Sequence, residues 1–483
     1  MTQKKENKLI SPSRRDFIKT GAVAAAGLMI VPRFVLGGKG YIAPSDRLII
    51  ASVGTGGKGK DDIAKFSKTG KAEIAFLCDV DDARAADTVK GFPKAKYYKD
   101  WREMFEKESK HFDAVSVSTP DHTHAIVAYH AMQLGKHVYV QKPLTHDIYE
   151  ARLLTNAAKK YKVVTQMGNQ GASNDGTRQL AEWYDAKVIG DVHTVYCWTN
   201  RPVWPQGIPW PATAAPIPSS LDWDLWLGTA PKKNFVNNLV PFNWRGWWDY
   251  GTGALGDMGC HLVEAPFRVL GLQYAKDVQA SVGSVYVGEF KQGRFPDSCP
   301  PSSHITLTFP KTHKTKGDVT LHWMDGGIQP ERPAELGANE LFGDDGNGTL
   351  FVGTKGKMMA DTYGLNPRLL PTSRTAEVQI KQTMARVTDQ SNGHYGQWID
   401  GCMAGYGNTK LSSSFDVAGP LTEALLMANL AVRGHDIAIK DAKGRDTYPG
   451  HIKMLWDNDN MKVTNFDPAN QYIKREYREG WTI

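Results

Sequence analysis

The chain has 483 residues, with 58 Lys and Arg against 51 Asp and Glu, and a formal net charge of +7. Residues 1–40 hold eight basic and two acidic residues, and so supply six of the seven positive charges. The rest of the chain is therefore nearly neutral, which excludes a nucleic-acid-binding protein of the generally basic kind. The spacing of the cysteines and histidines matches no zinc site, so we expect no metal.

Residues 1–40 are predicted to be an export signal and linker. A basic start is followed by Arg14 and Arg15, and then by an apolar run over residues 21–31. Paired arginines before a short apolar segment form the address read by the twin-arginine export machinery. A membrane helix needs about 20 apolar residues, so we expect no stable membrane anchor. We therefore predict a bacterial protein exported to the periplasm; the alternative is a disordered basic arm.

Short apolar runs alternate with helical patterns in residues 46–170. The predicted strands are 48–53, 74–78, 114–118, 138–140 and 163–165, and the clearest predicted helices are 123–134 and 147–161. Strands that alternate with helices favour parallel βαβ units, in which each helix crosses over to the next strand. The sequence therefore predicts an α/β fold with a doubly wound parallel sheet in this region.

A glycine-rich segment directly follows the first predicted strand. Gly54 permits a tight turn, Gly56 lets the backbone approach a pyrophosphate, and Gly59 lets the next helix pack closely. At the end of the second strand, the carboxylate of Asp79 is placed to accept hydrogen bonds from ribose hydroxyls and to repel a 2′-phosphate. NAD is therefore favoured over NADP; a surface loop without a ligand is the alternative. The predicted cofactor-binding residues here are Gly54, Thr55, Gly56, Gly57, Gly59 and Asp79.

Four further motifs give the chain a family resemblance. They are residues 118–124 (STPDHTH), 141–143 (QKP), 253–261 (GALGDMGCH) and 419–424 (GPLTEA). Together they resemble the Gfo/Idh/MocA family of oxidoreductases over nearly all of the chain after the signal. The resemblance implies an N-terminal Rossmann domain, residues 46–170, and a C-terminal substrate and oligomerisation domain, residues 171–483. The second domain is expected to be α+β with an open, mostly antiparallel sheet, and the protein to be a homo-oligomer, either dimer or tetramer.

The resemblance also implies the catalytic residues Lys142, Asp257 and His261. Asp257 and His261 are four residues apart, so on a helix they share one face. Oxidation of a secondary alcohol removes a proton from oxygen as hydride leaves carbon, and an imidazole suits this proton at neutral pH. His261 is therefore the expected acid/base, Asp257 the residue that binds or polarises the hydroxyl, and Lys142 the group that stabilises the developing alkoxide.

The segments around Lys142 complete the expected cofactor site. Gln141 stands where the family usually has glutamate, so the charge environment of Lys142 is expected to differ. His122 and His124 either border the nicotinamide or the substrate, or cap the helix that begins there, and both interpretations stay open. The expected cofactor-binding residues of this part are Thr119, Pro120, His122, His124, Gln141 and Lys142.

Residues 198–248 are rich in tryptophan and proline. The segment holds eight tryptophans, and six prolines between 202 and 218 break any long helix. Indole rings stack on sugar surfaces, and Arg201, Arg245 and Asp249 offer hydrogen bonds to hydroxyls, so the segment is predicted to cover the pocket. Packing of the rings against the body of the protein is the alternative for most of them. The expected substrate-binding residues are Arg245, Trp247, Asp257 and His261.

Export restricts the reaction, because free NAD is expected to be scarce outside the cytoplasmic membrane. The twin-arginine route carries folded proteins, so NAD can travel inside one. We therefore predict an exported NAD-dependent oxidoreductase that oxidises a hydroxyl of a sugar, glycoside or polyol with tightly bound NAD. The first alternative is a redox-neutral glycoside hydrolase that oxidises, eliminates, hydrates and reduces. The second is a non-catalytic sugar-binding protein on the same fold.

Overall fold

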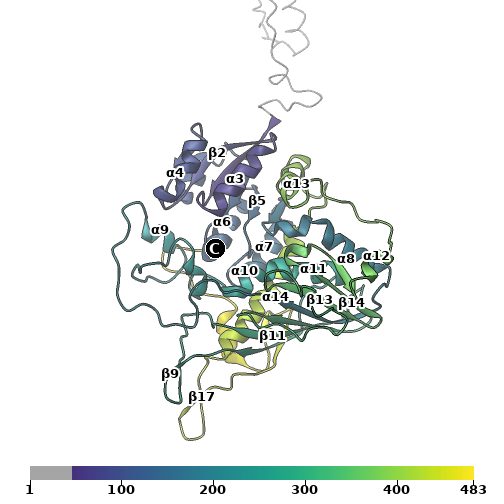
Figure 1. Cartoon of the computed structure of the whole chain (residues 1–483). Helices are drawn as coiled ribbons and strands as arrows, with labels where there is room; N and C mark the ends of the chain where they lie inside the picture. The colour runs from purple at the N-terminus through teal and green to yellow at the C-terminus, as the bar shows by residue number, and fades with distance from the viewer. Residues whose placement is uncertain (1–45) are drawn as a thin grey trace, which may run out of the picture. The chain divides into compact units, whose positions relative to one another are not determined.

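The computed structural model describes residues 46–483, so the predicted export signal, residues 1–40, lies outside the described part of the chain. Within the described part, Leu48–Ile483 form one unit, in which two sheets and their helices share a hydrophobic core. Figure 1 shows the course of the chain through these elements.

The first sheet has six parallel strands in the order β3-β2-β1-β4-β5-β6. The strands are β1 (Leu48–Val53), β2 (Ala72–Cys78), β3 (Lys96–Tyr98), β4 (Ala114–Val117), β5 (His137–Val140) and β6 (Thr165–Met167). The helices between them are α3 (Lys58–Lys68), α4 (Asp82–Gly91), α5 (Trp101–Glu108), α6 (Asp121–Gln133) and α7 (Ile148–Tyr161). Every residue of β4 is buried, because helices cover both faces of such a sheet. The predicted doubly wound parallel sheet is confirmed.

The sequence did not predict β3, which lies at an edge of this sheet. It pairs with β2, and its one exposed and two half-buried side chains form no apolar run. An edge strand is covered less completely than a central one, so its hydrophobic signal is weak.

The second sheet has nine strands in the order β15-β14-β13-β7-β12-β11-β8-β18-β19. The strands are β7 (Val192–Trp198), β8 (Asp277–Val282), β11 (Ser303–Phe309), β12 (Val319–Met324), β13 (Gly348–Gly353), β14 (Gly356–Ala360), β15 (Arg368–Leu370), β18 (Met454–Asp457) and β19 (Lys462–Val463). Only the β7–β12 pair is parallel. Buried and half-buried residues alternate along β11, so one face packs on the core. The predicted open, mostly antiparallel sheet is confirmed.

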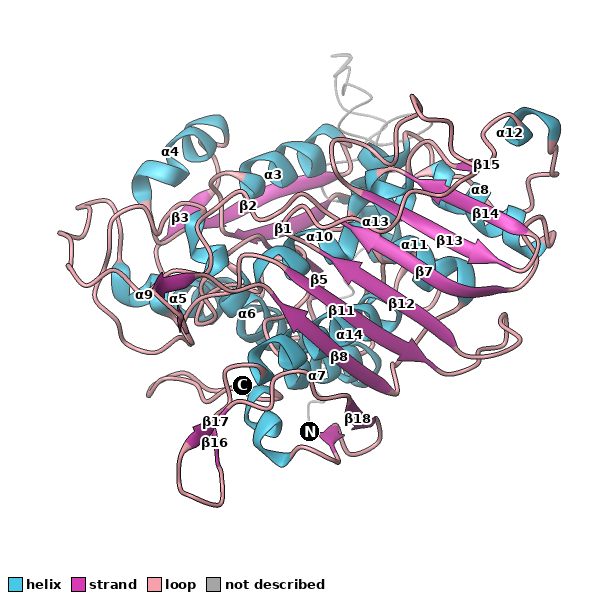
Figure 2. Ribbon diagram, turned by 60° about the horizontal axis from the view of Figure 1, so that its bottom comes forward, coloured by secondary structure: helices cyan, strands magenta, loops and turns pink. Residues whose placement is uncertain are grey.

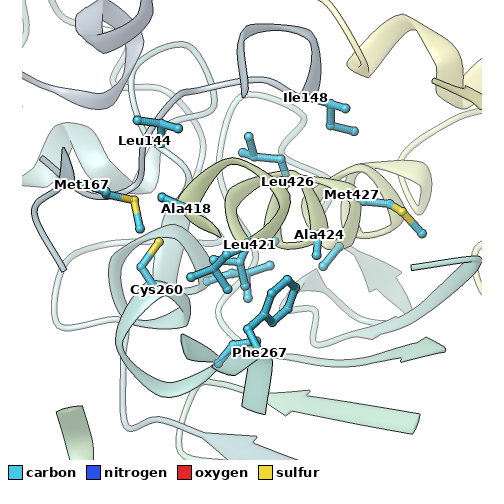
Figure 3. Packing of buried hydrophobic residues seen from close by; sticks show 14 of the residues in the cluster. Leu144, Ile148, Met167, Cys260, Phe267, Ala418, Leu421, Ala424, Leu426 and Met427 are labelled. Atoms are coloured by element: carbon cyan, nitrogen blue, oxygen red, sulfur yellow. The ribbon is translucent and has the colours of Figure 1, made fainter. Parts of the chain in front are cut away.

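Helices cover the buried face of the second sheet. Figure 2 shows α14 (Phe415–Gly434) behind β8 and β11, and α11 (Glu264–Leu270) behind β7 and β12. On its other side α14 meets α7, where Arg152 and Glu423 form an ion pair at 2.6 Å. Figure 3 shows Ile148 of α7 and Phe267 of α11 on opposite sides of α14. This helix is long and apolar enough to cross a membrane, but it is buried in the fold and joins the two sheets as a core helix.

The remaining described elements surround these layers. They are α8 (Asp175–Asp185), α9 (Trp223–Leu227), α10 (Gly253–Leu262), α12 (Arg374–Glu377) and α13 (Gln390–Ala404). Short 3₁₀ turns are η3 (Gln170–Ser173), η4 (Asn243–Gly246), η5 (Thr362–Gly364) and η6 (Asp467–Tyr472). Two small hairpins pair β9 (Tyr286–Gly288) with β10 (Lys291–Gln292), and β16 (Ile439–Lys440) with β17 (Asp446–Thr447). From late in the chain, α13 returns to pack beside α3 (Figure 1).

Candidate active site

The glycine-rich segment forms a tight turn between β1 and α3. Gly54 has a φ of +82°, and a Cβ there would lie 2.5 Å from the carbonyl oxygen of Ser118. A Cβ on Gly59 would lie 2.0 Å from the carbonyl oxygen of Gly54, so only glycine lets α3 begin this close to β1. The turn brings the N-terminus of α3 to the carboxyl end of β1, and a helix N-terminus stabilises phosphate groups.

Asp79 is held against this turn by backbone hydrogen bonds. Its Oδ2 accepts from the N–H groups of Thr55 at 2.7 Å and Gly56 at 3.1 Å. Its Oδ1 accepts from the N–H of Asp81 at 3.0 Å. The hydroxyl of Thr55 also lies 3.3 Å from Asp79, so this side chain turns toward the acid and does not line the cavity described next. The turn and the acid therefore form one unit, and Oδ1, which accepts one of these hydrogen bonds, keeps a lone pair for a further donor.

A cavity of about 540 Å³ connects the glycine turn to α10. One end is lined by Gly54, Gly56, Gly57 and Asp79. The other end is lined by Lys142, Arg245, Asp257 and His261, and Thr119, Pro120 and Gln141 also contribute to the wall. The size is that of a pocket for a cofactor or small ligand. One continuous surface thus joins the residues expected to bind a dinucleotide to those expected to carry out the chemistry.

Lys142 follows β5 and reaches across the cavity to α10. Its Nζ lies 2.8 Å from Oδ1 of Asp257 and 3.2 Å from the carbonyl oxygen of the same residue. The Nε of Arg245 lies 3.3 Å from that carboxylate oxygen. Burial acts to raise the pKa of Asp257, but the charges of Lys142 and Arg245 outweigh it and hold this pKa below its usual value. Asp257 is therefore an ionised carboxylate between two cations.

His261 lies one helical turn after Asp257 in α10. Its imidazole is buried, and within the described part of the chain its Nδ1 has no hydrogen-bond partner. Burial, reinforced by the charge of Lys142, lowers the pKa of His261 to about 3. The ring of Tyr363, from η5, packs edge-on with 4.7 Å between ring centroids. The site thus holds a neutral imidazole on the cavity wall, with an Nδ1 that makes no hydrogen bond to the described residues.

Gln141, the departure from the family pattern, turns toward α3. Its Nε2 donates to Oδ2 of Asp62 at 2.7 Å. The hydroxyl of Tyr395, from α13, donates to the other oxygen of Asp62 at 2.9 Å. The carboxylate that pairs with Lys142 is therefore Asp257 on α10, and the acid next to Gln141 belongs to α3.

His122 and His124 lie away from the cavity wall. The ring nitrogens of His124 lie 2.7 Å from the carbonyl oxygen of Pro143 and 2.8 Å from that of Thr119. His122 lies in the same way between the backbone carbonyl oxygens of Trp226, in the Trp-rich segment, and Tyr250, just after it. Neither side chain caps α6, which begins without a side-chain cap. Both rings tie loops together, and we leave them out of the proposed cofactor site.

The Trp-rich segment forms a small hydrophobic core of its own. Trp223 stacks on Trp226 with ring centroids 4.8 Å apart, and Trp247 packs against Trp210 at 4.7 Å. Trp226 and Trp244 line the cavity, but Trp247, an expected substrate-binding residue, does not. Most of these rings therefore pack the segment onto the body, and two of them reach the place where a ligand would lie.

Several cavity residues belong to no sequence pattern that predicts a place in the site. They are Lys58, Arg84, Trp101, Gln170, Tyr363 and Trp481. They come from separate elements, and only the fold brings them to one wall. Asp121 lies inside the 118–124 motif, whose spacing does not indicate its role: its carboxylate accepts from the hydroxyl of Thr252 at 2.6 Å and lies 3.3 Å from Arg245. It thereby fixes Arg245 beside Asp257.

Three family models match the chain. Residues 48–169 match the oxidoreductase family, NAD-binding Rossmann fold, and residues 183–309 match the oxidoreductase family, C-terminal alpha/beta domain. Residues 11–30 match the signal sequence of the twin-arginine translocation pathway. The two domain models together cover just over half of the chain.

Curated relatives match over shorter stretches. The chain is 26% identical over 171 residues to a glycosyl hydrolase family 109 protein of Shewanella pealeana, which covers 31% of this chain and 37% of that protein. It is 30% identical over 160 residues to inositol 2-dehydrogenase 3 of Saccharopolyspora erythraea, and this match covers 32% of this chain and 46% of that protein. The matches thus span less than half the length of these relatives.

Solved structures share the fold at low sequence identity. The WlbA dehydrogenase of Bordetella pertussis, in complex with NADH and UDP-GlcNAcA, is 15% identical with a TM-score of 0.52, over 80% of this chain and 97% of that one. GenD2 from gentamicin A biosynthesis, in complex with NAD, is 17% identical with a TM-score of 0.52, over 80% of this chain and 94% of that one. The fold and both domain models show that the chain belongs to the Gfo/Idh/MocA family of oxidoreductases with an NAD-binding Rossmann fold, and that it carries a twin-arginine export signal.

Proposed function

We propose that the protein reaches the periplasm with NAD tightly bound and oxidises a hydroxyl of a sugar, glycoside or polyol. The observation that carries this proposal is the single cavity that joins the glycine turn and Asp79 to Lys142, Asp257 and His261. A dinucleotide spans such a site from its phosphates to its reactive ring. When bound, NAD accepts hydride from the substrate carbon.

The residues at the glycine turn fit NAD. The turn leaves the N-terminus of α3 available for the negative charge of a pyrophosphate. The carboxylate of Asp79 suits ribose hydroxyls and disfavours a 2′-phosphate, so we propose NAD over NADP. The proposed cofactor-binding residues are Gly54, Gly56, Gly57, Gly59, Asp79, Thr119, Pro120, Gln141 and Lys142.

Lys142, Asp257 and His261 supply the acid–base chemistry in this proposal. Asp257 orients the reacting hydroxyl between the other two side chains. The ammonium of Lys142 stabilises negative charge as it develops on the substrate oxygen, which lowers the pKa of the hydroxyl. With a pKa of about 3, His261 is a weak base, so transfer of the proton to its imidazole depends on this help from Lys142.

The other end of the cavity supports tight retention of the cofactor. Trp101 of α5, Leu225 of α9 and Trp481 of the C-terminal tail all contribute to its wall. The tail is fixed in place, because the Nε of Arg478 donates to the carbonyl oxygen of Gly228 at 3.0 Å. A nucleotide that contacts three segments has more contacts to break than one on an open surface, so we expect it to leave more slowly. This enclosure favours a cofactor that stays bound through the catalytic cycle.

Redox-neutral cleavage of a glycoside is a second candidate, and the enclosed cofactor site favours it. A retained NAD must be reoxidised before the next turnover. In such a cycle, oxidation at C3 acidifies the C2 hydrogen, the aglycone is eliminated, water adds at C1, and hydride returns to C3. The sum is hydrolysis with no external acceptor. A relative that the chain resembles is named as a glycosyl hydrolase family 109 protein.

Product analysis of the mature protein, purified without added nucleotide, tests both candidates. The extracted nucleotide is identified by mass, and the holoprotein is incubated with a panel of glycosides and polyols. A keto-sugar together with reduced NAD supports the oxidoreductase, whereas free sugar and aglycone in equal amounts support the hydrolase. Lys142→Met should greatly reduce either product. A protein that holds no nucleotide and cannot be loaded with one would refute the proposal and favour the sugar-binding alternative.

A further inference from the structure

The catalytic end of the cavity carries more positive than negative side chains. Lys142, Arg201 and Arg245 line it, and Asp257 is the acid on the same part of the described wall. Asp121, buried behind the wall, lies 3.3 Å from Nη1 of Arg245. These three cations are thus accompanied by two carboxylates, while Lys58, which also lines the cavity, has Asp61 and Asp62 of its own helix as partners.

Arg201 is the cation in this group that lies farthest from a carboxylate. Lys142 and Arg245 each lie within 3.3 Å of a carboxylate oxygen. The Nε of Arg201 lies 3.9 Å from Oδ2 of Asp257, which is beyond hydrogen-bond distance. Its Nη1 donates to the side-chain oxygen of Asn200, and in the described part of the chain no acceptor is bonded to its Nη2. One edge of the guanidinium therefore has N–H groups to offer a ligand.

The backbone holds Arg201 at a defined place just after β7. Its carbonyl oxygen accepts from the N–H of Gly326 at 2.6 Å, and its own N–H donates to the hydroxyl of Thr199 at 3.3 Å. The side chain is 29% exposed, so it borders both the cavity and the solvent. A guanidinium in such a position suits a carboxylate, because the planar fork donates two parallel hydrogen bonds to its two oxygens.

We propose that the substrate carries a carboxylate, as a uronic acid or its glycoside does, and that Arg201 binds it. The inference rests on the proposed function, because it assumes that the reacting hydroxyl lies at Asp257 and His261. A neutral sugar would partly bury Arg201 with only the charge of Asp257, which lies 3.9 Å away and is shared with Lys142 and Arg245, and this costs free energy. An acidic sugar supplies a further negative charge, and Arg201 and Lys142 then hold the ring at two separate points. Arg201 is in this proposal the residue that determines the substrate class.

Matched pairs of ligands test this inference on the NAD-loaded holoprotein. Methyl glucuronides and galacturonides are compared with the matching glucosides and galactosides, each as both anomers. We expect the dissociation constant of the preferred acid, measured by calorimetry, to be about 10- to 100-fold lower than that of its neutral partner. Arg201→Gln should weaken the acid and remove the difference, and Arg201→Lys should restore part of it. Lys316→Gln, which removes an exposed cation outside the cavity wall, should leave the preference unchanged.

Equal binding of acid and neutral partner, or no binding of any pair, would overturn the inference. So would an equal loss of both ligands in Arg201→Gln. Reduction of the bound NAD separates this question from the proposed function. Reduction by neutral glycosides without any preference for acids would leave the proposed oxidation standing and refute the role of Arg201. Acid-selective binding with no reduction of NAD by any ligand would support the carboxylate site and refute the proposed oxidation.

Discussion

At the start of α6, the rings of His122 and His124 lie between backbone carbonyl oxygens, whereas in α10 the Nδ1 of His261 has no partner among the described residues. Burial lowers the pKa of all three, so the pKa direction does not distinguish them. Their hydrogen bonds and positions do: His122 and His124 lie against backbone carbonyl oxygens away from the cavity wall, whereas His261 lines the cavity and its Nδ1 is unpaired, although buried polar atoms normally have a partner. A buried histidine is therefore a candidate for chemistry when it lines the cavity and its nitrogens are not already committed to the fold.

Replacing His261 should have the largest effect and tests directly whether this residue acts in the reaction. His261→Asn removes the proposed base, and we expect the rate of reduction of bound NAD to fall about 10²- to 10⁴-fold. The free energy of unfolding should change little, because Nδ1 makes no hydrogen bond to the described residues. Single-turnover absorbance measures the rate, and urea unfolding measures the stability. An unchanged rate combined with a large loss of stability would show that His261, like His122 and His124, has a structural role.

The Trp-rich segment offers the same contrast between packing and binding. Trp223 is buried and stacked on Trp226, so Trp223→Ala should lower the free energy of unfolding by about 3–5 kcal/mol. Phe242 is 45% exposed and lines the cavity, so Phe242→Ala should raise KM for the substrate with little change in stability. Urea unfolding and steady-state kinetics on the two variants check this. If both variants lose stability to the same extent, Phe242 is also a packing residue.

His124 should show the opposite behaviour to His261. His124→Ala removes the ring between the carbonyl oxygens of Pro143 and Thr119, one of which accepts its single N–H, and we expect the free energy of unfolding to fall by about 1–3 kcal/mol. The rate of NAD reduction should fall much less than in His261→Asn. Urea unfolding measures the stability of this variant, and the same single-turnover assay measures its rate. A stable variant with a rate as low as that of His261→Asn would show that the start of α6 takes part in the chemistry.

The smallest expected effect is that of pH on the reaction. His261 has a pKa of about 3, and the pKa of Asp257 lies below its usual value, so neither group titrates between pH 5 and 8. The rate of NAD reduction should therefore show no step from either group in that range. The free energy of unfolding should depend on pH. In the unfolded chain His261 has its ordinary pKa of about 6.5, so below this pH it takes up a proton that the folded chain does not bind. The contribution of His261 to the free energy of unfolding therefore decreases as pH falls from about 6.5 towards 3. A rate that drops with an apparent pKa near 6.5 and is restored at higher pH would show that His261 titrates normally.

Local patterns in the sequence predicted the parts of the molecule that local contacts determine. The strand–turn–helix around Gly54 and the helix that carries Asp257 and His261 both depend on neighbours within a few residues. The sequence missed β3, because an edge strand needs little apolar surface, and it could not show that Gln141 would meet Asp62 of α3. Tyr363 and Trp481 reach the cavity only through the packing of distant segments. Trp247 was expected at the substrate because tryptophan suits both sugars and cores, and spacing does not separate these roles.

Rapid-mixing absorbance of the mature protein with its substrate, without added nucleotide, tests the central claim most directly. Mass analysis first shows whether each chain holds NAD. We predict a rise in NADH absorbance that reaches at most one equivalent per chain, is much slower in His261→Asn, and decays if hydride returns to the sugar. A wild-type protein that holds NAD, binds the sugar and forms product with no reduced NAD at any time would contradict the proposed oxidation.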